Sequence, residues 1–102
     1  MPKWTFITKH GAALGLISKY PKITALELGT AIGLTERTVR RIIADLYAVG
    51  YIKKKRVGRG MRYRVNHDQP LRYAIFSHVP VADFLEALGW KRPHRQAGKT
   101  PL

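Results

Sequence analysis

The chain of 102 residues lacks cysteine and long apolar runs, and we expect it to have no signal peptide. Without cysteine, it has no means of forming a disulfide, a zinc finger or a thiol switch within itself. No apolar run approaches the roughly 18 residues of a membrane-spanning helix. Lys9 and His10 interrupt the apolar positions near the N-terminus, where a signal peptide would need a continuous apolar stretch. We therefore expect one cytoplasmic domain without membrane contact.

Acidic residues are also scarce. Six Asp and Glu residues stand against nineteen Lys and Arg residues, which gives a formal net charge of +13 at pH 7. Ten of the nineteen basic residues lie between Arg37 and Arg64, where only Asp45 opposes them. A sequence pI near 10.7 with a clustered basic face is the electrostatic footprint of nucleic-acid binding. A solvated basic face without any ligand is the alternative.

Catalytic groupings are missing as well. Ser77 and His78 are adjacent, and so are His67 and Asp68. Sequence neighbours rarely present both side chains to one substrate, and no nucleophile elbow surrounds Ser77. The four histidines have no paired-ligand spacing of a metal site. We predict a protein that is not an enzyme and that holds neither a metal nor another cofactor.

Residues 24–46 carry the signals of two short helices joined by a tight turn. Thr24 and Glu27 have the spacing of a capping box. Gly33 suits the left-handed residue that ends a helix, and Thr35 suits the N-cap of a second helix at 36–49. Gly29 has no side chain to keep the two helices apart. Four apolar residues of the second helix fall on one stripe: Val39, Ile42, Ile43 and Leu46.

The basic segment that follows, residues 51–65, predicts a β-hairpin. Two glycines in residues 56–61 permit the chain reversal. The side chains expected to face the core are Ile52 on the first strand and Tyr63 and Val65 on the return strand. The same alternation would bury Lys54 and Arg56, so we expect those two side chains to lie past the edge of the core. A helix pair followed by such a hairpin predicts a winged helix-turn-helix.

The flanking segments give weaker signals. Apolar spacing predicts a helix over residues 4–19, a short helix at 71–77 and an amphipathic helix at 81–88 that Gly89 ends. Residues 22–23 are expected to add a short strand to the hairpin. Residues 91–102 are basic, contain proline and glycine, and show no periodicity, so we expect a disordered tail.

The run IGLTERTVRRIIADL, then GYI, then a basic hairpin ending in YRV, resembles winged helix-turn-helix regulators of the MarR-like kind. The resemblance covers about residues 5–66. It implies an α+β fold, mainly α with a small β-hairpin, in a DNA-binding domain of residues 1–90. It also implies that helix 36–49 is a recognition helix for the major groove and that wing 51–65 contacts the backbone or minor groove.

Candidate DNA-binding residues lie at the start of helix 36–49 and along the wing. Arginine is the residue that most commonly makes specific contacts to guanine. Glu36 is suited either to accept a hydrogen bond from cytosine or to stabilise the positive end of the helix dipole. On the helix the candidates are Thr35, Glu36, Arg37, Thr38, Arg40 and Arg41. On the wing they are Lys53, Lys55, Arg59, Arg62 and Arg64.

We expect a transcriptional regulator that binds specific sequences of double-stranded DNA. The alternatives are a winged-helix adaptor for RNA or a protein partner, and a nonspecific nucleoid-coating protein. A single winged helix buries a small interface, so we expect a homodimer on a palindromic site. No residue argues for a small-molecule effector. The residues expected at the dimer interface, which suit one shared core equally well, are Trp4, Leu16, Tyr20, Phe84, Leu85, Leu88 and Trp90.

Overall fold

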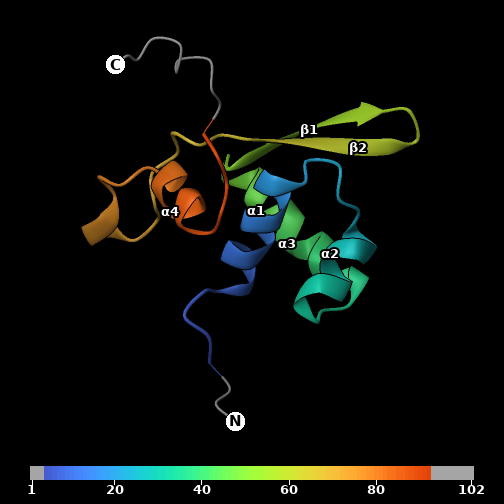
Figure 1. Cartoon of the computed structure of the whole chain (residues 1–102), viewed down its shortest axis with the longest axis horizontal. Coiled ribbons are helices and arrows are strands. Elements are labelled where there is room, and N and C mark those ends of the chain that lie inside the picture. Colours follow the sequence, from blue (N-terminus) through green and yellow to red (C-terminus); the bar gives the residue numbers. More distant parts are fainter. Residues whose placement is uncertain (1–3, 93–102) are drawn as a thin grey trace.

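The computed structural model describes residues 4–92 as a group of short helices from which one β-hairpin projects (Figure 1). The elements in chain order are α1 (Lys9–Lys19), α2 (Ala25–Ile32), α3 (Glu36–Ala48), β1 (Ile52–Val57), β2 (Gly60–Val65), the 3-10 turn η1 (Ala74–Phe76) and α4 (Val81–Ala87). The predicted α+β class is therefore confirmed. The order of the elements is compatible with a winged helix.

Helix α2 begins and ends where the local signals place it. The Thr24 hydroxyl accepts a hydrogen bond from the Glu27 amide at 3.0 Å, and the Glu27 carboxylate accepts one from the Thr24 amide at 2.9 Å. Gly33 ends the helix with φ of 74°, in the left-handed region. A Cβ atom on Gly29 would lie 2.5 Å from the carbonyl oxygen of Leu34. The turn between α2 and α3 therefore requires glycine at this position.

The core lies between α1, α2, α3 and the base of the hairpin, with α4 packed on α1. The predicted apolar stripe of α3 is buried in it. The main buried side chains are Leu14, Ile17, Leu28, Val39, Ile42, Ile43, Leu46, Ile52, Val81 and Leu85. This core fixes which face of α3 points outward.

The first helix is shorter than the predicted range 4–19, because α1 begins at Lys9. Thr8 has extended backbone and its hydroxyl accepts a hydrogen bond from the Gly11 amide at 3.0 Å, so it acts as the N-cap. Residues 4–7 precede this cap and are not helical. The Trp4 ring stands edge-on to Phe6 there, at 5.5 Å between centroids.

The hairpin pairs β1 and β2 antiparallel, from Ile52 opposite Val65 to Val57 opposite Gly60. Gly58, with φ of 61°, and Arg59 form the two-residue turn. The prediction of a strand at 22–23 is wrong. A single backbone bond, from the Tyr63 amide to the Pro21 carbonyl at 2.8 Å, ties this linker to β2. Pro21 has no N–H group with which to continue a ladder.

The segment after the hairpin contains less helix than predicted. The helix expected at 71–77 is wrong except for the single turn η1. Its bonds, such as the Phe76 amide to the Tyr73 carbonyl at 2.8 Å, span three residues and do not propagate. Helix α4 is confirmed, and Gly89 follows it with φ of 103°. The tail expected at 91–102 lies outside the described residues except for its first two.

Candidate nucleic-acid interface

Helix α3 presents arginines on the side away from the core. Arg37 and Arg41 are four residues apart, so they lie one above the other on the outward face, and both are exposed. Arg40 lies on the flank of the helix that faces the hairpin, where it lines a groove. On the opposite flank, Asp45 accepts from His10 of α1 at 2.8 Å. The hairpin side of α3 is therefore basic, and its other side is tied to α1.

The first turn of α3 uses its polar side chains largely within the helix. Arg40 donates to the Glu36 carboxylate at 2.6 Å, as an i, i+4 pair. The Thr35 hydroxyl accepts from the Thr38 amide at 3.2 Å and donates to the Thr38 hydroxyl at 3.0 Å. Glu36, Thr35 and Thr38 thus stabilise the start of the helix. Arg37 and Arg41 remain the outward-pointing cations.

A groove separates α3 from the hairpin, and its lining is basic. The face of the hairpin that carries Ile52 and Tyr63 turns toward α3, and Lys54 and Arg56 continue that face outward. Both are exposed, which confirms that they lie past the edge of the core. Among the described residues, no acidic side chain lines this groove. Its basic lining residues are Lys22, Arg40, Lys54, Arg56 and Arg59.

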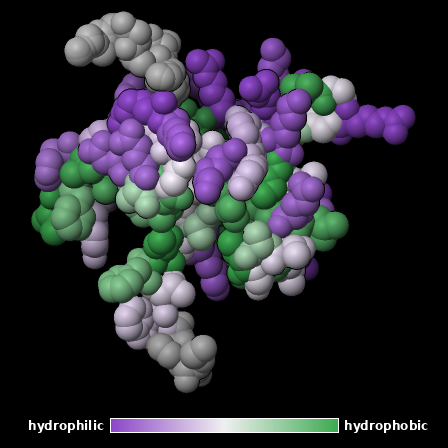
Figure 2. Space-filling view, viewed as in Figure 1, coloured by the Kyte–Doolittle hydropathy of each residue, from purple (hydrophilic) through white to green (hydrophobic). Residues whose placement is uncertain are grey.

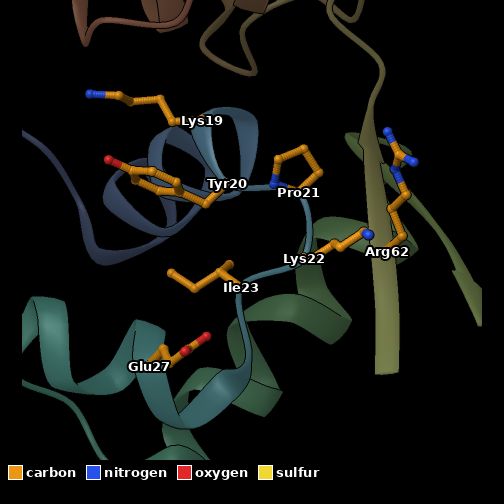
Figure 3. A pocket seen from close by; sticks show the side chains of 7 residues that line it. All are labelled: Lys19, Tyr20, Pro21, Lys22, Ile23, Glu27 and Arg62. Atoms are coloured by element: carbon orange, nitrogen blue, oxygen red, sulfur yellow. The ribbon is translucent and has the colours of Figure 1, made fainter. Parts of the chain in front are cut away.

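Sequence reasoning left Lys22, Lys54 and Arg56 out of the candidate site. The two-residue alternation of a strand was sufficient to place Lys54 and Arg56 on the inner face of the hairpin. No sequence signal places Lys22 there, because the linker reaches the groove only through tertiary packing. Figure 3 shows Lys22 extending toward the strand that carries Arg62, away from Glu27.

The charge of Arg40 also reaches Tyr63 across the groove. Burial raises the pKa of the Tyr63 hydroxyl above its usual value, and the positive charge of Arg40 lowers it by a smaller amount. Tyr63 therefore stays neutral at physiological pH. Its ring is part of the apolar lining of the groove, between the basic side chains.

The tip of the hairpin adds one cation that extends beyond the rest. Arg59 follows Gly58 in the turn, and both residues are exposed. Arg59 lines the groove beside α3, so the tip and the inner face belong to one surface. Figure 2 shows hydrophilic side chains gathered along this projecting hairpin.

Four predicted wing residues lie on the other face of the hairpin. Lys53 pairs directly with Arg64, and Lys55 pairs directly with Arg62. Their side chains point away from α3, because adjacent residues of a strand face opposite sides. Together with the inner face and the tip, they make seven cations between residues 53 and 64. Within residues 4–92, none of the seven forms an ion pair.

The residues expected at a dimer interface do not form one exposed surface. Leu85 is fully buried in the core, so its assignment to an interface is wrong. Phe84 and Leu88 pack on α1. A Cβ atom added to Gly11 would lie 3.2 Å from Phe84, and one added to Gly15 would lie 2.9 Å from Leu88. Leu16 and Trp90 are partly buried beside the core, whereas Trp4 and Tyr20 are exposed by 67% and 54%.

Two negative findings apply to residues 4–92. This part of the chain holds no cluster of three or more His, Asp or Glu side chains suited to a metal ion. It also holds no helix that is both long and apolar enough to cross a membrane.

Comparisons with protein-family models, curated proteins and solved structures give no match for the chain.

Proposed function

We propose that the chain is a winged-helix transcriptional regulator that binds specific sequences of double-stranded DNA, with a MarR-like helix-turn-helix. The observation that supports this most directly is the groove between α3 and the hairpin. Its five basic side chains come from the linker, from α3 and from the wing, and no acidic side chain lines it among the described residues. Such a surface fits a phosphate backbone that runs between a helix and a wing.

In this proposal α3 enters the major groove. The helix has 13 residues, a length of about 20 Å at 1.5 Å per residue, and the major groove is wide enough to admit it. Arg37 and Arg41 then face the base edges, where arginine recognises guanine through two hydrogen bonds. Arg40, which Glu36 holds on the flank, faces a phosphate.

The wing follows the adjacent backbone. Lys54 and Arg56 lie on its inner face and Arg59 at its tip, all on the groove side. Arginine is favoured in a narrow minor groove, where the negative potential is enhanced. These side chains position the protein, while α3 reads the sequence.

A nonspecific DNA-coating role is the second candidate. The unpaired cations on both faces of the hairpin favour it, because such contacts do not depend on sequence. Sequence-specific binding differs from coating in that it enriches particular sequences.

Selection from a random duplex library distinguishes the two. The full chain is mixed with the library at physiological salt, and the bound duplexes are sequenced. We expect enrichment of one short motif in two inverted copies about 10 bp apart. Retained duplexes without a motif would indicate coating. If duplexes are not retained but RNA is, the chain is an adaptor and the proposal is wrong.

A further inference from the structure

The hairpin carries two basic surfaces, and they face in opposite directions. Lys54 and Arg56 lie on the side of α3. The outer face carries four cations, Lys53, Lys55, Arg62 and Arg64, which line a second groove, beside α1, together with Lys54 and Tyr63. None of these four lines the groove beside α3. Lys54 and Tyr63 line both grooves, so the grooves meet along the hairpin, but of the two grooves the four outer cations line only the second.

The second groove has its own walls. Ser18 at the end of α1 and Pro21 of the linker lie on one side, and His67 and Trp90 lie at one end. The rings of His67 and Trp90 are 5.3 Å apart between centroids. Trp90 is only partly exposed and packs beside the core. The exposed lining is thus mostly cationic.

The four cations form a compact array with opposing like charges. Lys53 lies directly opposite Arg64, and Lys55 directly opposite Arg62. Such cross-strand pairs destabilise a hairpin when nothing neutralises them. No acidic residue occurs between Asp45 and Asp68 to do so. The array therefore suits a polyanion that supplies the missing negative charge.

One duplex does not reach both surfaces. A duplex seated against α3 approaches the hairpin from its inner side, whereas the outer side chains point the opposite way. The outer array is thus left available while the inner groove is filled.

We infer that the outer face of the hairpin binds the phosphate backbone of a second DNA duplex, so that one chain bridges two DNA segments. Along each strand the outer cations recur every second residue, about 6.7 Å apart, and they face closely spaced phosphates. A duplex fits better than a single strand, because Tyr63, His67 and Trp90 of this groove are only partly exposed, whereas single-strand sites offer exposed aromatic side chains for base stacking. This inference rests on the proposed function, because a bridge between two duplexes needs the first DNA site beside α3.

A bridging assay tests this. One duplex is fixed to beads, a second duplex carries a fluorophore, and the full chain is added at physiological salt. The fluorescence recovered on the beads measures bridging, and binding of one duplex in solution is measured separately. The outer variant combines Lys53→Gln, Lys55→Gln, Arg62→Gln and Arg64→Gln. The inner control removes the same charge through Lys22→Gln, Arg40→Gln, Arg56→Gln and Arg59→Gln, four residues that line only the groove beside α3 of these two grooves.

We expect the outer variant to keep its affinity for one duplex within about threefold, because the outer side chains point away from a duplex seated against α3. Its bridging should fall at least about tenfold through loss of four phosphate contacts. The inner control should lose affinity for one duplex, and bridging with it. The outer variant should melt no lower than the original chain, because it has lost two like-charge pairs.

Four results would overturn the second site. If the original chain binds one duplex but does not recover a second, bridging is wrong and the proposed function stays intact. Bridging that survives in the outer variant would mean that two copies of the chain hold the duplexes. Recovery of labelled single-stranded RNA in place of duplex would assign the outer face to RNA. Failure of the original chain to bind any duplex would overturn the proposed function as well.

Discussion

The Lys54 ammonium group lies 4.7 Å from the centre of the Tyr47 ring. This cation–π contact joins the inner face of the hairpin to the flank of α3 that faces it. Tyr47 is half-exposed and lies two turns beyond Arg40 on the same flank of the helix. The contact helps to set the distance between the wing and α3, and hence the width of the basic groove.

A double-mutant cycle measures this contact. Tyr47→Leu and Lys54→Gln are made singly and together, and urea unfolding gives the free energy of each protein. We expect a coupling of about 0.5–1 kcal/mol, the usual size of a cation–π contact at an exposed site. Tyr47→Phe keeps the ring and serves as the control, so it should couple to Lys54 as Tyr47 does. A coupling near zero would show that the ring does not hold the ammonium group.

The helix pair was predictable because its signals are local. Thr24 and Glu27 satisfy each other's backbone amides across three residues, and Gly33 needs only its own left-handed conformation. Thr35 likewise caps α3 through a bond to Thr38. None of these interactions depends on a distant part of the chain. Sequence spacing alone therefore places both helices within one residue of their ends.

The flanks were less predictable because tertiary contacts decide them. The apolar spacing before Thr8 extends the pattern of α1, yet the Thr8 cap starts the helix at Lys9. The periodicity of α4 shows that Leu85 is on an apolar face, but not whether another chain or the same chain covers it. The basic groove is similar, since Lys22 reaches it only after the linker has folded back beside β2.

We expect Arg37 and Arg41 to read bases and Arg40 to contact phosphate. Single alanine variants are compared for binding to a selected duplex and to a random duplex. Arg37→Ala and Arg41→Ala should each reduce discrimination by about 1–3 kcal/mol, the value of one bidentate contact to guanine. Arg40→Ala should weaken both duplexes by the same factor, because phosphates carry no sequence.

Arg72→Ala is the matched control for these variants. Arg72 is exposed and lines neither groove of the hairpin. It should therefore change binding to both duplexes very little. If Arg37→Ala and Arg41→Ala weaken the selected and the random duplex equally, α3 does not read the sequence.

Gly29 within α2 and Gly33 at its end should differ in their response to alanine. A Cβ atom on Gly29 would lie 2.5 Å from the Leu34 carbonyl oxygen, and backbone does not yield easily. Gly29→Ala should therefore cost about 1–3 kcal/mol of unfolding free energy, the usual cost of overpacking. At Gly33 no atom lies within 4 Å, but φ is 74°. Gly33→Ala should cost about 1 kcal/mol from strain alone.

Gly33→Asn separates these two causes. Asparagine tolerates the left-handed region better than alanine, so it should recover most of the loss at Gly33. The same residue at Gly29 would clash as alanine does. Urea unfolding of the four variants provides the comparison. If asparagine recovers as much of the alanine loss at Gly29 as at Gly33, the close approach of Gly29 to Leu34 is contradicted.

We predict a homodimer on the palindromic site, although the structure leaves a smaller apolar surface for it than the sequence indicates. Sedimentation at micromolar concentration, alone and with the selected duplex, should give the mass of two chains per site. Trp4→Ser and Tyr20→Ser change exposed side chains and should weaken the association. Leu85→Ala should cost about 2–5 kcal/mol of stability as a core variant, with no change in mass. The mass of one chain in both conditions would exclude the dimer.

The tip of the wing should contribute a measurable number of phosphate contacts. Arg59 is exposed at the turn and lines the groove beside α3, so a duplex seated on α3 meets it directly. Removing one phosphate contact lowers the slope of log K against log salt by about 0.9. Arg59→Ala should flatten the slope by that amount if it binds one phosphate, and Arg72→Ala should leave it unchanged. An Arg59→Ala variant with the original affinity and slope would show that the tip does not touch DNA, which would restrict the interface to α3 and the strands.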